Sequence, residues 1–224
     1  YGAHGTSHRY VAGRAAKMLN KPLADLKLIT CHLGAGASIT AIKGGKSLDT
    51  SMGFSPLAGI TMATRSGDVD PSLVNFMEHK LNISSDDMID ILNHKSGLLG
   101  ISGISSDMRD VEKAAKEGNQ RAQLAIEKDV NSVVKYIGSY IAEMNGVDAI
   151  VFTAGVGEND INFREAVGNR LGYFGVKMDH EKNNIRGEER VISADDSKVK
   201  VLLIPTNEEL MIVRDIERLK KQAK

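Results

Sequence analysis

The stretch GAHGTSH near the start of the chain offers two histidines among small and hydroxyl side chains. We expect His8 to lie on a helix and His4 to lie in a glycine-flanked loop, where its ring can face a ligand. The spacing of the two histidines also suits zinc, but neither a nearby third ligand nor the Glu of an HExxH motif accompanies them. The stretch therefore favours a histidine that contacts a ligand over a metal site.

Two turns rich in glycine are candidates for binding a phosphate or a nucleoside. HLGAGAS places Gly34 and Gly36 after a β-branched run. VFTAGVGEN places Gly155 and Gly157 between a predicted strand and a helix. Such turns leave backbone N–H groups open to an anion. A hairpin with His32 as a half-buried polar side chain explains the first turn equally well, and packing of a strand against a helix explains the second.

Charged side chains in two further stretches are suited to a phosphorylated ligand. TRSGDVDP presents Arg65 from a loop, where a guanidinium can donate two hydrogen bonds to phosphoryl or carboxylate oxygens. Pairing of Arg65 with Asp68 or Asp70 is the alternative. SSDMRD places Asp107 and Arg109 at a helix start, where they either cap the helix or contact a ribose or base.

The stretch PTNEEL predicts a helix capped by Asn207, with Glu208 in the first turn as a carboxylate that could hold Mg²⁺ through water. The residues from Gly45 to Ser47 imitate the end of a P-loop. Thr40 stands where the P-loop needs glycine, and a strand follows where it needs a helix. We therefore interpret this stretch as a turn with a solvated lysine.

Hydrophobic periodicity, capping residues and turn signals predict the elements that must position these side chains. Three strands in an antiparallel meander come first, and strands alternate with helices later. The long helix has an apolar stripe that includes Leu124. Predicted helices cover 6–20 (capped by Thr6 or Ser7), 71–80, 84–95 (Ser84 or Ser85), 107–116 (Ser105 or Ser106), 120–145, 161–171 and 207–221; predicted strands cover 26–33, 37–43, 46–50, 148–154 and 198–205; 51–70 and 97–106 are predicted loops.

Composition limits the classes of function. The 224 residues contain 29 Lys plus Arg and 29 Asp plus Glu, so no net charge draws the chain to nucleic acid or anionic lipid. Aromatic residues make up only 4%, which disfavours a base-stacking surface. No apolar run approaches the ~20 residues of a membrane helix. The single cysteine, Cys31, suits a reducing compartment, so we expect a cytoplasmic location. The balanced charge, the few aromatic residues and the short apolar runs together predict an α/β protein without nucleic-acid or membrane partners.

Taken together and in this order, the motifs resemble those of the acetate kinase family, which moves a phosphoryl group between ATP and a short-chain carboxylate. The resemblance covers the whole chain, through YGAHGTSH, ITCHLGAGAS, DTSMGFSPLAGITMATRSGDVDP, GISGISSDMRD, VFTAGVGEN and IPTNEEL. It implies one ribonuclease-H-like half of the actin, sugar kinase and Hsp70 fold, with a mixed sheet and flanking helices. It further implies that residues 1–224 are the C-terminal nucleotide-binding domain of a two-domain kinase whose N-terminal domain is absent here, and that this domain forms a homodimer.

The resemblance also assigns roles to individual residues. His4 and Arg65 would stabilise the transition state, and Glu208 would help to hold Mg²⁺. ATP or ADP would contact His32, Leu33, Gly34, Ala35, Gly36, Asp107, Met108, Arg109, Gly155, Val156, Gly157, Glu158 and Asn159.

Two positions depart from the family pattern. Ala3 stands where the family has a large aromatic beside the histidine, which would enlarge or loosen the carboxylate pocket. Ala35 replaces the usual asparagine near the phosphates, although the backbone donors of that turn remain. A propionate or butyrate kinase is therefore one alternative to an acetate kinase. A non-catalytic module for nucleotide binding or dimerisation is the alternative from another class.

Overall fold

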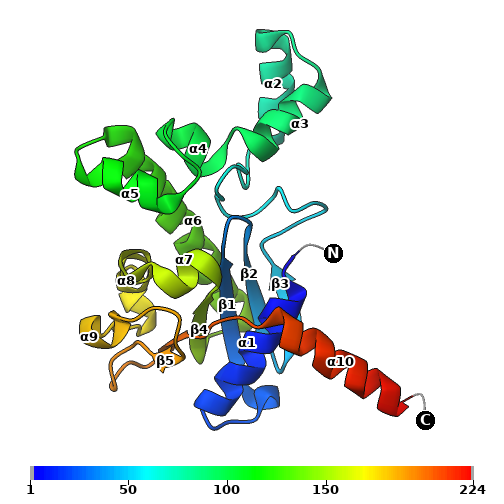
Figure 1. The fold of residues 1–224 in the computed structure, drawn as a ribbon, viewed down its shortest axis with the longest axis vertical. Helices are drawn as coiled ribbons and strands as arrows, with labels where there is room; N and C mark the ends of the chain where they lie inside the picture. Colours follow the sequence, from blue (N-terminus) through cyan, green and yellow to red (C-terminus); the bar gives the residue numbers. More distant parts are fainter. Residues whose placement is uncertain (1–2, 223–224) are drawn as a thin grey trace.

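The sheet organises the molecule in the computed structural model, which describes residues 3–222 (Figure 1). Within these residues its strands follow the order β3-β2-β1-β4-β6-β5. The strands are β1 (Lys27–Leu33), β2 (Ala37–Lys43), β3 (Lys46–Thr50), β4 (Ala149–Thr153), β5 (Arg190–Val191) and β6 (Lys200–Leu203). β1, β4 and β6 are parallel, whereas β2, β3 and β5 pair antiparallel to their neighbours. The predicted mixed sheet with an antiparallel meander is confirmed.

Helices flank this sheet and extend from one end of it. They are α1 (Gly5–Met18), α2 (Pro71–Leu81), α3 (Ser85–His94), α4 (Gly97–Ser102), α5 (Met108–Lys116), α6 (Gln120–Met144), α7 (Ala154–Asn159), α8 (Ile161–Asn169), α9 (His180–Asn183) and α10 (Glu208–Gln222), with 3-10 turns at Leu23–Asp25 and Gly172–Phe174. None of the helices within residues 3–222 combines the length and apolarity needed to cross a membrane.

The core has two parts, one on each face of the sheet. On one face, Val11 and Ala15 of α1 pack with Leu28 of β1. On the other face, Ile137 of α6 packs in the cluster that contains Ile29, the next residue of β1. Successive side chains of a strand point to opposite faces, so β1 is buried along nearly its whole length because both faces are covered.

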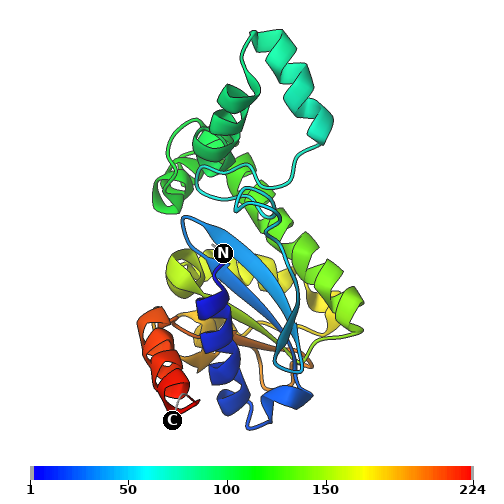
Figure 2. The same cartoon turned by 90° about the vertical axis from the view of Figure 1, so that its right-hand side faces the viewer.

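A pair of helices stands away from the sheet. Figure 2 shows α2 and α3 extending beyond the sheet as a separate arm. Asp70 caps α2 by accepting a hydrogen bond from the Ser72 N–H, and Ser84 forms a capping box with Asp87 at the start of α3. Both helix starts agree with the sequence prediction.

The predicted loop over 97–106 is wrong in its first part, because α4 occupies Gly97–Ser102. Two glycines in six residues conceal this helix in the sequence, and packing against α6 supports it through the buried Leu98. Gly97 has φ 59°, and a Cβ there would lie 2.1 Å from the Met62 carbonyl oxygen. Only glycine therefore fits where α4 meets the long loop that carries Arg65.

Other differences concern side chains on predicted elements. Leu124 of α6 is exposed rather than part of its apolar stripe, because Ala122 and Ala125 take the buried positions of that turn. The strand β5 and the helix α9 lie in a charged segment whose sequence predicted neither. Both are shorter than five residues, so periodicity carries no signal for them.

Candidate active site

A cavity of about 650 Å³ opens at the carboxyl ends of the parallel strands β1 and β4. Ligands of open α/β sheets bind at such ends. Both glycine turns contribute to its wall, as do the start of α5 and the start of α8. Of the predicted nucleotide contacts, the cavity is lined by Leu33, Gly34, Ala35, Asp107, Met108, Arg109, Gly155, Val156 and Asn159.

His4 and Arg65 converge on the first glycine turn. A Cβ placed on Gly36 would lie 3.1 Å from Arg65 Nη1 and 3.6 Å from His4 Nε2. A side chain at position 36 would therefore crowd the Arg65 guanidinium, and glycine lets two nitrogen-bearing side chains from distant parts of the chain approach this turn closely. The two candidate catalytic residues, 61 positions apart in the sequence, share one point beside the cavity.

The loop that carries Arg65 is held by backbone hydrogen bonds on both sides. The Arg65 carbonyl accepts from the Met62 N–H at 3.1 Å, and the Ser66 N–H donates to the Leu92 carbonyl of α3 at 2.9 Å. The Ala63 N–H donates to the carbonyl of Ala35 at 3.3 Å, which joins this loop to the glycine turn. The backbone that carries the guanidinium is therefore ordered beside the glycine turn in the absence of a ligand.

Arg65 has no acidic partner within residues 3–222, so pairing with Asp68 or Asp70 is excluded. Asp68 accepts from the Gly59 N–H and from Tyr136, and Asp70 caps α2. The side chain of Arg65 makes only a weak contact of 3.9 Å with the sulfur of Met62. A half-buried cation without a counterion is suited to an anionic ligand.

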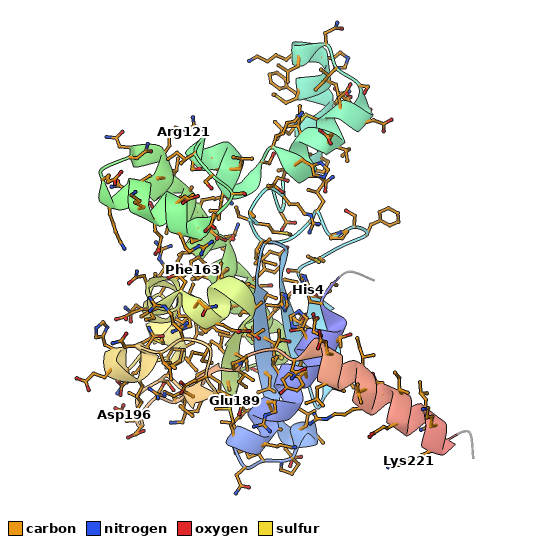
Figure 3. The ribbon with its side chains drawn as sticks, viewed as in Figure 1. His4, Arg121, Phe163, Glu189, Asp196 and Lys221 are labelled. Carbon is orange, nitrogen blue, oxygen red and sulfur yellow. The ribbon has the colours of Figure 1, made fainter. Side chains whose placement is uncertain are left out.

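His4 lies beside the start of α1 (Figure 3) and belongs to a cluster of histidines and hydroxyls between α1 and the strands β1 and β2. His4 Nδ1 and Ser38 Oγ lie 2.9 Å apart, and the same oxygen lies 2.8 Å from His8 Nε2. His8 Nδ1 in turn lies 2.7 Å from Thr30 Oγ1. The His4 ring stacks on that of His32, with centroids 3.9 Å apart. This network fixes the His4 ring and leaves Nε2 directed towards Gly36.

The start of α1 differs from the prediction. His4, and not Thr6 or Ser7, occupies the N-cap position, with φ 57° in the left-handed region. This backbone is strained for a histidine, and such strain concentrates at functional sites. Ser7 is unavailable as a cap because its hydroxyl lies 2.8 Å from His32 Nδ1 and 2.7 Å from Thr206 Oγ1.

Burial lowers the pKa of each histidine in the cluster. The pKa of His8 falls to about 3 and that of His32 to about 4, first because of desolvation and then because of neighbouring histidines. Desolvation also lowers the pKa of His4, and Arg65 lowers it further, while Glu208 raises it. At neutral pH, His4 is therefore a neutral hydrogen-bond donor or acceptor beside the permanently charged Arg65.

These shifts predict a pH dependence of stability. The unfolded chain protonates His8 and His32 below pH 6.5, whereas the folded chain does not, so the free energy of unfolding falls as the pH falls from 6.5 towards about 4. Ring resonances in NMR spectra should show no titration of His8 or His32 between about pH 7.5 and 5. His180, whose pKa is raised by Glu165, serves as the titrating control. Protonation of either cluster histidine above pH 6 would contradict the network.

Glu208 starts α10 and lies close enough to His4 to influence its pKa. The predicted cap of this helix is confirmed, since Asn207 Oδ1 accepts from the Leu210 N–H at 2.9 Å. Within residues 3–222 no three His, Cys, Asp or Glu side chains are grouped to hold a metal ion. Glu208 fits only a cation that keeps most of its water or shares ligands with a substrate.

Asp107 and Arg109 border the cavity from the start of α5. Asp107, rather than Ser105 or Ser106, is the N-cap, and its carboxylate accepts from the Arg109 N–H at 2.9 Å. The Arg109 guanidinium also pairs with this carboxylate and is largely exposed. The capping interpretation therefore holds for Asp107, and it leaves the Arg109 side chain at the cavity mouth.

The second glycine turn is a short helix, α7, and not an open loop. Glu158 does not face the cavity. Its carboxylate accepts from the Ala154 N–H at 2.8 Å and from the Thr206 N–H at 3.0 Å, which ties α7 to the segment before α10. Gly157 packs behind the turn, where an added Cβ would lie 3.7 Å from the Cys31 carbonyl. Gly155, Val156 and Asn159 remain on the cavity side.

Sequence reasoning missed two residues near this turn. Arg164 of α8 is fully buried and donates to the Gly157 carbonyl at 3.1 Å and to Asn183 Oδ1 at 2.8 Å. Asp129 of α6 is buried in the cavity wall. A lone charged residue on an amphipathic helix is usually solvated, so neither carried a signal in the sequence.

The fold and the cavity define an α/β protein with a ligand site at the carboxyl ends of its parallel strands. Residues 1–214 match the model of the acetokinase family. The chain is 75% identical over 223 residues to the acetate kinase of Limosilactobacillus fermentum, of which it covers 56%, and 58% identical to that of Bacillus subtilis, of which it covers 56%. The protein belongs to the acetokinase family.

Solved structures agree with this assignment. The acetate kinase of Porphyromonas gingivalis superposes with a TM-score of 0.93 at 47% identity, over 95% of this chain and 53% of that one. A propionate kinase from Francisella tularensis gives a TM-score of 0.88 at 46% identity, over 95% of this chain and 54% of that one. The predicted fold, one half of the actin and sugar kinase type, is confirmed. The chain spans about half the length of the relatives it matches.

Proposed function

We propose that this chain is the nucleotide-binding part of a kinase that transfers the γ-phosphoryl group of ATP reversibly to acetate. The approach of Arg65 Nη1 and His4 Nε2 to the Gly36 turn, beside a cavity of nucleotide size, carries the proposal. Phosphoryl transfer demands positioning and charge stabilisation more than covalent catalysis. The Arg65 cation, the neutral His4 imidazole held by its network and the backbone of the glycine turn would supply those two requirements.

In this proposal a carboxylate oxygen of acetate attacks the γ-phosphorus in line, and the bond from that phosphorus to the β-bridging oxygen breaks. The products are acetyl phosphate and ADP, and no proton is transferred. Arg65 neutralises charge on the equatorial phosphoryl oxygens, and His4 Nε2 hydrogen-bonds one of them. Ser38 and His8 hold the imidazole in place. The turn of Gly34–Gly36 receives the phosphates.

Glu208 is the residue of this chain that would hold Mg²⁺, and the ion would supply positive charge that offsets the negative charge of the nucleotide phosphates. A single carboxylate suits Mg²⁺, which usually keeps several waters and takes one or two carboxylates together with substrate phosphates. The absence of a preformed cluster of acidic ligands within residues 3–222 agrees with binding that depends on the nucleotide.

The reaction needs a closed cleft, and we propose that another domain, matching the remaining half of the relatives, completes it. The test is a full-length graft, in which residues 1–224 replace the matching stretch of the L. fermentum acetate kinase. The graft should form acetyl phosphate, trapped as the hydroxamate, whereas the chain of 224 residues should give no turnover above background. An inactive but folded graft, or robust turnover by the chain alone, would contradict the proposal.

A propionate kinase is the second candidate, favoured by Ala3. This small side chain packs beside the core next to His4, where a large aromatic would narrow the pocket. Discrimination by one methylene is worth only about 1–3 kcal/mol. The same hydroxamate assay, run on the graft with acetate, propionate and butyrate, ranks the three by kcat/KM. An Ala3→Phe variant should shift the ranking towards acetate if Ala3 sets the pocket.

A homodimer and a cytoplasmic location complete the proposal. The buried thiol of Cys31 suits a reducing compartment. The arm of α2 and α3 carries exposed apolar side chains, among them Phe76 and Leu81, which suit a protein contact. A module that only binds nucleotide or dimerises is the remaining alternative. Arg65, which lies at the cavity edge without an acidic partner among the described residues, speaks against it.

A further inference from the structure

A buried carboxyl group lies in the cavity wall where α5, α6 and α8 meet. Asp129 keeps 8% of its surface exposed and lines the cavity. Its backbone carbonyl accepts from Ser132 Oγ at 2.7 Å, but nothing within residues 3–222 donates to its carboxyl group or pairs with it. Burial of an unpartnered carboxyl group is costly. The group is therefore oriented towards whatever fills the cavity.

The part of the cavity around Asp129 has the character of a nucleobase site. Ile161 and Phe163 of α8 supply apolar lining to the cavity, whereas Met62 lies towards the first glycine turn, its sulfur 3.9 Å from Arg65 Nη1. Figure 3 shows Phe163 and His4 on opposite sides of the central strands. A ligand whose phosphates lie at Gly34 would place its base against this apolar wall. Pockets of this kind use one or two polar groups to orient an apolar ligand face.

We propose that Asp129 recognises the nucleobase, its neutral carboxyl group accepting a hydrogen bond from the exocyclic amine of adenine and donating its own proton to the adjacent ring nitrogen. The inference rests on the proposed function, which places a nucleotide in this cavity. A protonated carboxyl group carries one donor and one acceptor, and the edge of adenine presents the complementary acceptor and donor. No covalent step is involved.

The surroundings of Asp129 keep its carboxyl group neutral. Burial first, and then the nearby Asp160, raise its pKa to about 8, against the opposing effect of Lys128. The pKa of Asp160 is itself raised, chiefly by burial. The charged groups around this end of the cavity are Glu112 and Lys116 on α5, Lys128 on α6, Asp160 at the N-cap of α8, Arg164 on α8, and Arg186.

Two substitutions separate recognition from a structural role. Asp129→Asn keeps one donor and one acceptor at any pH, and Asp129→Leu removes both while filling the space. Glu143→Gln on the exposed side of α6 is the matched control. The probes are ADP and N6,N6-dimethyl-ADP, which lacks the amine hydrogens, titrated calorimetrically into the chain of residues 1–224 at pH 6.5 and pH 8.5.

At pH 6.5 we expect the wild-type chain, the Glu143→Gln variant and the Asp129→Asn variant to bind ADP with equal affinity. At pH 8.5 the wild-type chain and Glu143→Gln should bind ADP more weakly than Asp129→Asn does, because the Asp129 carboxyl group has then lost its proton. Asp129→Leu loses both hydrogen bonds to the base, so it should bind ADP about tenfold more weakly than the wild-type chain at pH 6.5. It should weaken binding of dimethyl-ADP by a smaller factor, because that ligand keeps the ring nitrogen as an acceptor but has no amine hydrogen to donate.

The inference about Asp129 would be overturned by equal ADP affinity in the wild type and Asp129→Leu, or by equal pH dependence of ADP binding in the wild type and Asp129→Asn. Either result would leave the proposed nucleotide site intact. If Asp129→Leu does not fold, the comparison with Asp129→Asn decides. Absence of ADP binding by the wild type would overturn the nucleotide assignment of the cavity, and the inference with it.

Discussion

Replacing Arg65 with alanine in the full-length graft should lower kcat/KM about 10²- to 10³-fold, as loss of one preorganised donor to a charged transition state does elsewhere. The guanidinium has no acidic partner within residues 3–222 and lies beside Gly36 next to the cavity. Its removal therefore deletes charge stabilisation without breaking an ion pair of the fold. The measurement is steady-state kinetics by the hydroxamate assay.

Two further variants control this result. Arg65→Lys keeps the charge but not the planar fork of donors, so it should recover only part of the lost kcat/KM. Lys46→Ala removes an exposed cation from the turn that imitates a P-loop, and it should leave the kinetics unchanged. Near-normal turnover by Arg65→Ala would show that the guanidinium does not act on the phosphoryl group.

Replacing Arg164 with methionine should lower the free energy of unfolding of the chain by about 3–5 kcal/mol. Arg164 is fully buried, and its guanidinium also donates to the carbonyls of Asn183 and Ile185, at 2.9 and 2.7 Å. Methionine fills much of the space but leaves these buried acceptors unpaired. Urea unfolding followed by circular dichroism measures the change.

The control is Arg170→Met, six residues further along the chain at the C-cap of α8. Arg170 is partly exposed and lies 3.7 Å from Glu127, a surface ion pair worth at most about 1 kcal/mol. A loss below 1 kcal/mol for Arg164→Met would show that the buried guanidinium does not hold α7 and α8 together.

Local signals in the sequence predicted most of the secondary structure. Pro71 at the start of α2, the capping box at the start of α3 and the apolar period of α6 each involve residues that are close in the sequence. These signals can therefore be recognised in the sequence itself. α4 was missed because its stability depends on burying Leu98 against a helix that follows it in the chain. Propensity does not report such contacts.

The motifs and their resemblance to a family predicted which residues form the site, but not how they are held. The predicted meander places Ser38 on β2, but no local pattern reveals its hydrogen bond to the His4 ring, 34 residues away in the sequence. Glu158 was predicted to contact nucleotide, whereas its carboxylate ties two backbone segments together. Tertiary folding decides which of several polar residues in a motif face the cavity and which support it.

The most direct test is to record the NMR signals of the amide groups of the chain as ADP is added up to about 10 millimolar. A ligand with a Kd of that size binds with a free energy of roughly 3 kcal/mol, so even weak binding would be detected. The account predicts that the amide signals of Gly34, Gly36 and Gly155 shift together and saturate, while those of the α2–α3 arm stay in place. A spectrum that does not change, or changes confined to surfaces away from the two glycine turns, would contradict it.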